Sequence, residues 1–383
     1  MLDVFRFHVP STSLFGPGCI NELGYEIARL NHKKTLIVTD TFLVELGLIK
    51  RLQEILEKSE IKSCVYDGVQ PNPTVEQVEN ALDMYKAEGC DCLITVGGGS
   101  AHDCGKGVSI LVTNCGQIKD YLGTNQTKKK GCDLFAVNTT AGTASEITTT
   151  YVLTDTKTHT KMVFEDRNCL ATVAVNDPEL MVSLPKMLTA TTGMDAMTHA
   201  IECYTSNYSA TVTSALALDA VRMIANNLEG AVNTPQDIVK RDGMSTGQYI
   251  AGMAFGNGGV GIVHSMAHQL GGVYNIPHGL ANAVLLPYVV EYNGKAVANL
   301  YADIYKTICP EAQGSDAEMT EKLVEWIKDF NKKLGITSSL GELGVQEDML
   351  GTLAEKALQD VCTATNPIEP SKDDILQIYK AAM

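Results

Sequence analysis

Four of the eight histidines of this chain fall in one part of its second half, and their spacing suits metal binding. Asp195 and His199 lie four residues apart, and His264 and His268 repeat that spacing. Residues four apart lie on one face of a helix, so each pair can direct two side chains toward one ion. His278 follows in a Pro-His-Gly segment, typical of a turn that can direct an imidazole back toward the helices.

A single histidine in an apolar helix is usually a hydrogen-bonded core residue, but that explanation fits this group poorly. Burying several ionisable side chains without partners is costly, and a bound metal offsets that cost. Three imidazoles and one carboxylate suit Fe²⁺, Zn²⁺, Co²⁺ or Ni²⁺, and do not suit Mg²⁺ or Ca²⁺. These side chains therefore indicate a transition-metal site without choosing among the metals.

The first half contains a glycine-rich turn of the kind that binds phosphate. Residues 97–100, Gly-Gly-Gly-Ser, lie between a strand-like run that ends at Val96 and a helical pattern that continues to Val112. Glycines there let a phosphate approach the backbone, and the helix N-terminus presents unpaired N–H groups. Ser100 suits the N-cap of that helix. The turn alone is weak evidence, because tight turns need glycine anyway and the G-x-G-x-x-G spacing is absent.

A second polar turn, residues 138–146, follows the apolar run Leu134–Val137. Its hydroxyl side chains can bind phosphate and ribose oxygens, although a Thr-rich capped turn is an equally good explanation of this segment alone. Two such turns after parallel strands meet at the carboxyl edge of a sheet, where open α/β folds bind ligands. Asp40, which ends an earlier strand, can accept hydrogen bonds from a ribose diol, which favours NAD over NADP; it also suits the N-cap of the next helix.

Alternating strand-like and helix-like segments predict the fold class of the first half. The strand-like runs are residues 35–39, 62–66, 92–96 and 134–137, and the helical patterns include residues 46–56 and 75–87. This alternation predicts an α/β domain with a parallel, Rossmann-like sheet covered by helices. The alternating side chains of Val4–Val9 also predict an edge strand, which could pair across a dimer.

The second half changes character to long helical patterns. They cover residues 190–204, 211–228, 238–255 and much of 317–383, with a turn at Asn366-Pro367. The change falls between Asp177 and Pro185, and 383 residues are too many for one ordinary core. We therefore expect an α/β NAD-binding domain over residues 1–182 and an all-helical, metal-binding catalytic domain over residues 183–383.

Composition excludes several classes of partner. The net charge of −15 argues against a nucleic-acid partner, because that affinity comes mainly from clustered Lys and Arg. No run of about 18 apolar residues is present, so we expect no membrane span. The start of the sequence has no basic region followed by an apolar stretch, and the eleven cysteines are odd in number and scattered. We therefore expect a reduced, cytoplasmic protein.

Together these motifs resemble the iron-containing (type III) alcohol dehydrogenase family over nearly the whole chain, from residues 14–18 to residues 360–362. The matching segments are residues 97–100 with Asp103, 139–143, 193–200, 264–271 and 277–279. Within the family they are similar to 1,3-propanediol dehydrogenases, lactaldehyde reductases and NAD-dependent methanol dehydrogenases. The resemblance implies an α/β N-terminal domain with an all-α C-terminal domain, the dehydroquinate synthase-like fold.

The resemblance also implies roles for individual residues. It makes Asp195, His199, His264 and His278 the metal ligands, and His268 a residue near the substrate that does not bind the metal. The residues implied to line the NAD site are Asp40, Asn72, Gly97, Gly98, Gly99, Ser100, Asp103, Thr139, Thr140, Thr143, Thr148, Lys161 and Leu180.

One segment departs from the pattern of the family. Residues 256–261, Gly-Asn-Gly-Gly-Val-Gly, contain more glycines than relatives usually carry. An extra glycine costs about 1 kcal/mol relative to alanine where the chain is helical. We expect this departure to affect the wall of the substrate pocket and not the metal ligands.

The expected activity is hydride transfer between NAD(H) and a small primary alcohol, diol or aldehyde, such as 1,3-propanediol, in a cleft between the two halves. The metal, Fe²⁺ or alternatively Zn²⁺, would act as a Lewis acid, and His268 would either relay a proton or orient a ligand. Relatives form dimers or larger rings, so we expect a homo-oligomer.

The alternative is a metal- and NAD-dependent lyase of the dehydroquinate-synthase type. That reaction needs several Lys and Arg to bind an acidic, phosphorylated substrate. Besides histidine, residues 195–287 contain only three basic side chains, those of Arg222, Lys240 and Arg241. They lie far from the ligand motifs in sequence, which favours the dehydrogenase.

Overall fold

The computed structural model describes residues 4–157 and 160–383; residues 1–3, at the start of the expected first domain, lie outside it. Internal contacts divide the chain into two compact units. The α/β unit comprises His8–Thr140 and Ala144–Val182, and the helical unit comprises Ser183–Met383, Ala141–Thr143 and the N-terminal segment that ends at Phe7. The assignment of residues 1–182 and 183–383 as domains remains a prediction.

A parallel sheet forms the centre of the α/β unit. Among the described residues it has six strands in the order β1-β9-β6-β4-β2-β3, and every neighbouring pair is parallel. The strands are β1 (Thr12–Phe15), β2 (Lys34–Val38), β3 (Lys62–Tyr66), β4 (Cys92–Gly97), β6 (Leu134–Asn138) and β9 (Val173–Asn176). The order reverses between β2 and β4, which creates the type of crevice where such sheets bind ligands.

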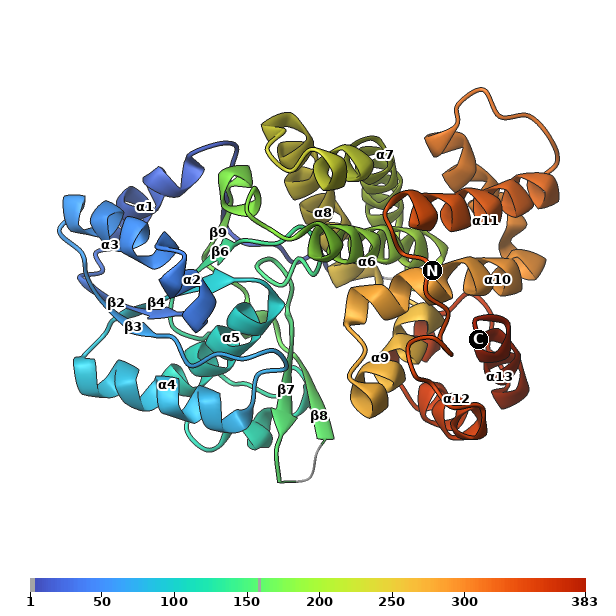
Figure 1. Ribbon diagram of the computed structural model, residues 1–383. Helices are drawn as coiled ribbons and strands as arrows, with labels where there is room; N and C mark the ends of the chain where they lie inside the picture. Colours follow the sequence, from blue (N-terminus) through green and yellow to red (C-terminus); the bar gives the residue numbers. More distant parts are fainter. Residues whose placement is uncertain (1–3, 158–159) are drawn as a thin grey trace. The chain divides into compact units, whose positions relative to one another are not determined.

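Helices cover both faces of this sheet (Figure 1). On one face, α1 (Leu23–Arg29) and α3 (Leu48–Lys58) pack with Ile37, Ile94 and Phe135. On the other, α4 (Val75–Glu88) and α5 (Gly99–Thr113) pack with the preceding strand residues, Leu36, Leu93 and Leu134. Successive strand residues point to opposite faces, so burial of both faces explains why these strands are almost wholly apolar.

The α/β unit also contains a small second sheet that the sequence analysis did not predict. Its strands are β5 (Gly123–Thr124), β7 (Thr150–Asp155) and β8 (Thr160–Glu165), in the order β5-β8-β7. Shorter elements of the unit are α2 (Thr41–Glu45), η1 (Cys19–Glu22), η2 (Ile118–Tyr121), η3 (Arg167–Cys169) and η4 (Pro178–Met181).

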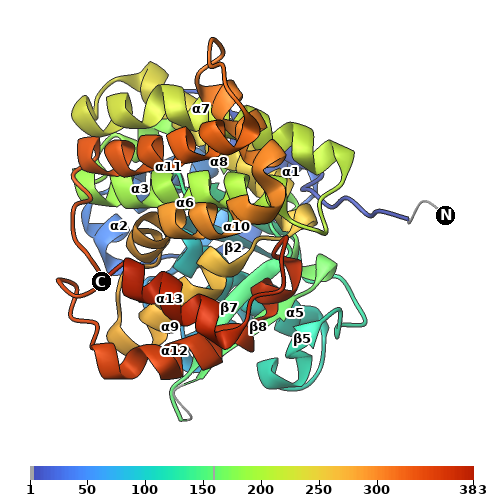
Figure 2. The ribbon, with the colours of Figure 1, turned by 90° about the vertical axis from the view of Figure 1, so that its right-hand side faces the viewer.

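The helical unit is built around α6 (Lys186–Thr205) and α10 (His278–Ile308), which contact each other (Figure 2). Around them lie α7 (Thr211–Asn233), α8 (Ile238–Gly258), α9 (Ile262–Tyr274), α11 (Asp316–Lys333), α12 (Leu350–Leu358) and α13 (Lys372–Ala381), with η5 (Glu347–Met349) and η6 (Val361–Thr365). Most of α6 is buried, including the polar residues Asp195, His199 and Glu202. In the part of the chain that the structure describes, no helix is both long and apolar enough to cross a membrane.

This architecture confirms the predicted parallel α/β first half and helical second half, but four details of the prediction are wrong. Residues 4–9 form no strand in the single chain; β1, one of the two edge strands, begins beyond Pro10. The helical pattern over residues 46–56 is interrupted at Gly47, where φ is +81°. Gly98, not Ser100, is the N-cap of α5. His278 is the first residue of α10 and not part of a free turn.

The close packing of α5 on the sheet yields a stability prediction. A Cβ built on Gly105 lies 2.0 Å from Thr95 Cγ2, so Gly105→Ala should overpack this contact and lower the free energy of unfolding by about 1–3 kcal/mol. Urea unfolding followed by far-UV circular dichroism measures the change. Gly351→Ala is the matched control, because a Cβ there meets no atom within 4 Å. Equal stability of the two variants would contradict this packing argument.

Candidate metal centre and cofactor site

The helical unit brings the four predicted metal ligands together from the helices α6, α9 and α10. Asp195 and His199 lie four residues apart on α6, and both are buried. Coordinating atoms of Asp195, His199 and His264 all lie within 4.8 Å of one another. His278 Nε2 lies 3.4 Å from Asp195 Oδ1. Asp195, His199 and His264 thus form one candidate ligand group, and His278 lies next to Asp195.

The state of the His199 side chain fits a transition-metal ion. His199 Nδ1 is buried and has no hydrogen-bond partner among the described residues. Burial, followed by the neighbouring His264, holds the pKa of His199 well below its ordinary value, so the ring is neutral as a metal ligand must be. Burial opposes protonation of His264, but the hydrogen bond and charge of Glu202 raise its pKa.

Asn282 is a buried residue at this centre that the sequence analysis missed. Its Nδ2 donates a hydrogen bond to Asp195 Oδ1 at 2.6 Å, and it lies 3.1 Å from His278 Nε2 and 3.4 Å from His264 Nε2. It sits four residues after His278 on α10, so the spacing that identified the other pairs could also have identified it. Its contact with Asp195 orients that carboxylate.

His268 lies beside the centre and has its own carboxylate partner. Its Nδ1 is 2.9 Å from Asp360 Oδ2, and its ring stacks on that of His278 with centroids 5.4 Å apart. Burial opposes ionisation of Asp360, but hydrogen bonds from His268 and the Cys362 backbone keep its pKa below the ordinary value. The sequence analysis used Asp360 only as part of a family motif and gave it no role.

In the α/β unit, the two predicted phosphate-binding turns lie side by side. Gly97 adopts φ +150°, which favours glycine, and its carbonyl accepts a hydrogen bond from Thr139 N. A Cβ on Gly98 would lie 3.0 Å from Thr140 Oγ1. As the N-cap of α5, Gly98 has no side chain that could bond the first amides of the helix, so those donors suit a phosphate. Gly99 and Ser100 form the first turn of α5.

Asp40 lies at the end of β2, next to this glycine turn. Its Oδ1 accepts a hydrogen bond from Leu43 N at 2.9 Å, so it does cap α2, as the simpler explanation requires. A Cβ on Gly97 would lie 4.0 Å from Asp40 Oδ2. The capping hydrogen bond uses Oδ1 of Asp40, and Oδ2 lies on the side of the glycine turn. Capping and ribose binding are therefore compatible.

A buried polar cluster surrounds Asp103 on α5. Asp103 accepts hydrogen bonds from Ser145 Oγ at 2.7 Å and Val152 N at 3.0 Å. Lys106, which the sequence analysis missed, donates to Ser145 Oγ and to Thr148 Oγ1. The charge of Asp103 acts on the nearby Lys161, whose side chain is exposed. The cluster therefore joins two predicted NAD residues, Asp103 and Thr148, and Lys161 lies near its edge.

Three predicted NAD residues lie elsewhere. Asn72 is exposed in the turn before α4, where its φ is +58°. Leu180 is buried in the core that also contains α1 and α3. Thr143 belongs to the helical unit by its contacts. The assignment of these three residues to the NAD site stays a prediction.

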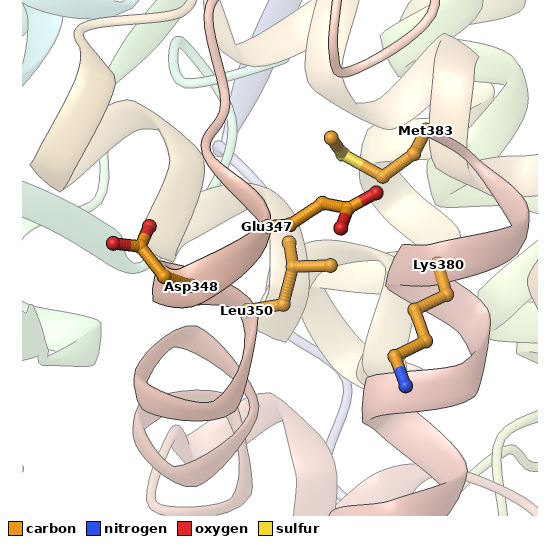
Figure 3. A pocket seen from close by; sticks show the side chains of 5 residues that line it. All are labelled: Glu347, Asp348, Leu350, Lys380 and Met383. Carbon is orange, nitrogen blue, oxygen red and sulfur yellow. The ribbon is translucent and has the colours of Figure 1, made fainter.

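A separate pocket near the C-terminus contains none of these residues (Figure 3). It is lined by Glu347, Asp348, Leu350, Lys380 and Met383. The side chains of Asp348 and Lys380 point in different directions and do not meet at one point (Figure 3). This pocket therefore adds nothing to the assignment of the site.

Comparisons with known proteins identify the family of this chain. Residues 10–178 match the model of the iron-containing alcohol dehydrogenase family, and residues 189–383 match the C-terminal model of the same family. Alcohol dehydrogenase 4 of Schizosaccharomyces pombe is 42% identical over 100% of this chain and 90% of its own length. The NAD-dependent methanol dehydrogenase of Bacillus methanolicus is 40% identical over 99% of this chain and 100% of its own.

A solved structure also supports membership of this family. The crystal structure of a 1,3-propanediol oxidoreductase superposes with a TM-score of 0.98 at 41% identity, and the match covers 100% of both chains. The resemblance inferred from the motifs is thereby confirmed. This chain belongs to the iron-containing alcohol dehydrogenase family.

Proposed function

We propose that this protein is a metal-dependent oxidoreductase that transfers a hydride between NAD(H) and a small primary alcohol or diol and its aldehyde. The convergence of Asp195, His199, His264 and His278 carries the proposal. The relatives support the substrate class, because they include enzymes named for methanol and for 1,3-propanediol. The nicotinamide performs the redox chemistry, while the protein binds and orients it.

The residues of the helical unit would hold one divalent metal, with Fe²⁺ favoured by the family and Zn²⁺ compatible with the same ligands. When bound, the metal supplies Lewis-acid chemistry toward the substrate oxygen. His199 contributes a ring kept neutral by burial, and Asn282 holds the Asp195 carboxylate in place. Bonds that fix the orientation of ligands in this way strengthen metal binding.

The residues of the α/β unit would hold NAD. Gly97 and Gly98 leave room for the pyrophosphate at the N-terminus of α5, and Thr139 and Thr140 lie next to them. The free oxygen of Asp40 would bind the ribose diol and repel a 2′-phosphate, so we expect NAD in preference to NADP.

His268 would move the proton that accompanies hydride transfer. A carboxylate only accepts hydrogen bonds, so the contact with Asp360 places a proton on Nδ1 and leaves Nε2 able to accept one. The His268 side chain is 32% exposed, so it can exchange protons with water. These properties support a relay over a purely structural role.

The structure gives the alternative lyase little support. Arg222 pairs with Asp219 and the Lys240 ammonium donates to the Asn226 carbonyl. Arg241 is buried, and its guanidinium donates to Thr189 Oγ1. Among the contacts described, none of these three side chains interacts with a proposed metal ligand. They therefore do not indicate a site for a phosphorylated, acidic substrate beside the proposed metal.

The direct test is the absorbance of NADH with a panel of short alcohols, diols and aldehydes, after anaerobic purification and metal analysis. We expect one transition-metal ion per chain and activity with NAD on at least one primary alcohol or diol. An enzyme that binds metal and NAD but converts no member of the panel in either direction would contradict the proposal. Size-exclusion chromatography of the same sample tests the predicted homo-oligomer.

Removing one ligand should separate metal binding from cofactor binding. We expect Asp195→Ala to bind metal more weakly by more than about 100-fold, exceeding the loss typical of an outer-shell partner, because it removes a direct ligand. Metal analysis and NADH fluorescence provide the readouts, and NADH affinity should stay within about twofold of wild type. Asp219→Ala, which removes an exposed carboxylate paired with Arg222, is the control. Full activity of Asp195→Ala would refute the ligand assignment.

Removing the relay should slow turnover without releasing the metal. General acid–base groups contribute about 10²- to 10⁴-fold, so we expect His268→Ala to lower kcat by at least the smaller factor while metal content is retained. The matched control is His32→Ala, because His32 also contacts an aspartate, Asp133, at 3.0 Å. If kcat of His268→Ala equals that of wild type across the pH range, His268 takes no part in the proton transfer.

A further inference from the structure

Glu202 is a buried carboxylate on α6, and both of its oxygens bond to α9. Oε2 lies 2.5 Å from His264 Nδ1, and Oε1 accepts a hydrogen bond from Val263 N at 2.6 Å. We propose that Glu202 is a positioning residue that fixes the orientation and tautomer of His264 for metal binding. This inference rests on the proposed function, because it requires His264 to be a metal ligand.

The hydrogen-bond pattern determines which nitrogen of His264 faces the other ligands. An ionised carboxylate only accepts, so the proton of the neutral ring lies on Nδ1, between His264 and Glu202. The lone pair then lies on Nε2, which is 3.9 Å from Asp195 Oδ1. The negative charge of Glu202 also makes the ring a stronger electron donor, as carboxylates behind metal-bound imidazoles do.

Glu202 shares a helix with two of the predicted ligands. Asp195, His199 and Glu202 occupy positions i, i+4 and i+7 of α6, which lie on one helical face. The helix therefore presents two ligands directly and controls a third through Glu202. A displacement of α6 relative to α9 would disturb all three together, so one buried element sets the geometry of most of the centre.

The glycine-rich segment 256–261 allows this contact. A Cβ on Gly261 would lie 2.9 Å from Glu202 Oε1 and 3.0 Å from Asn366 Oδ1. A Cβ on Gly258 would lie 2.7 Å from the sulfur of Cys203, the residue after Glu202. Gly261 thus lets α6 approach the start of α9, and Gly258 lets the end of α8 approach α6. Gly261 therefore lies beside the proposed metal centre, and the expected effect of this segment on the substrate pocket stays a prediction.

Gly261 is the N-cap of α9 and has no side chain to bond the first amides of that helix. Glu202 supplies an acceptor for Val263 N from another helix, and the partial positive charge of the helix N-terminus favours its carboxylate. This backbone contact alone would make Glu202 a structural cap. The contact with His264 would in addition make Glu202 affect metal binding. Protein stability measures the capping role, whereas metal affinity measures the positioning role.

The test loads the full-length protein with Co²⁺ and compares wild type with Glu202→Gln. We expect metal affinity to fall by about 10- to 100-fold in competition with a chelator. We also expect the visible ligand-field spectrum of Co²⁺ to change, because His264 loses its charged partner, while NADH affinity stays at the wild-type value. Asp303→Asn is the matched control in the same unit, because it removes a carboxylate that accepts only from the hydroxyl of Tyr204 among the contacts described.

A second variant tests the same contact from the other side. Gly261→Ala places a Cβ against Glu202 Oε1, so it should weaken Co²⁺ binding in the same direction and change the spectrum. The double variant should bind no more weakly than the more affected single variant, because both substitutions break one contact. If Glu202→Gln does not fold, the affinity and spectrum of Gly261→Ala decide the question.

The outcomes distinguish this inference from the proposed function. Wild-type affinity and an unchanged Co²⁺ spectrum in Glu202→Gln, even with reduced stability, would make Glu202 a structural cap and overturn the inference alone. Failure of the wild-type protein to bind Co²⁺, Fe²⁺ or Zn²⁺ at one ion per chain would overturn the proposed metal-dependent function as well.

Discussion

Charged and ionisable side chains are costly to bury. In the helical unit, this cost constrains the residues around the proposed metal centre. Asp195, His199, His264 and Glu202 are all buried, and each would be unfavourable there without a partner. The structure meets this cost with short contacts among them and with Asn282. His264 and His278 lie near the starts of α9 and α10, and α10 packs against both α6 and α9. A metal ion would complete the compensation.

In the α/β unit the constraint is different: at the proposed cofactor site, a ligand must be able to approach the backbone. Its parallel strands end at one edge, and the order reversal between β2 and β4 places Asp40 next to Gly97. Side chains larger than hydrogen would fill the space at Gly97 and Gly98. Buried polar residues around Asp103 then hold α5 against β7 through the bond to Val152 N. The proposed cofactor site therefore depends on the absence of side chains at Gly97 and Gly98 as well as on the polar groups around Asp103.

Local patterns in the sequence predicted the parts of this structure that are encoded locally. Helical patterns and apolar runs describe single helices and strands, so α6, α8, β2 and β4 were predicted close to their observed bounds. Partners distant in sequence were missed. Glu202 contacts His264 across 62 positions, and Asp360 contacts His268 across 92. The prediction of an edge strand at residues 4–9 was wrong for the same reason. An alternating pattern of side chains does not show whether a neighbouring strand is present to pair with it.

His264 and His268 show why spacing alone could not separate a ligand from a proton relay. They share one face of α9, and each directs Nδ1 toward a carboxylate, so tautomer and orientation are fixed in the same way. Exposure differs: the side chain of His264 is 4% exposed and that of His268 is 32% exposed. The partly exposed ring of His268 can pass a proton to solvent, which suits the proposed relay. Exposure does not by itself separate the proposed roles, because the proposed ligand His278 is 39% exposed. His278 differs from His268 in its contact with Asp195 at 3.4 Å, and this contact joins residues far apart in the sequence.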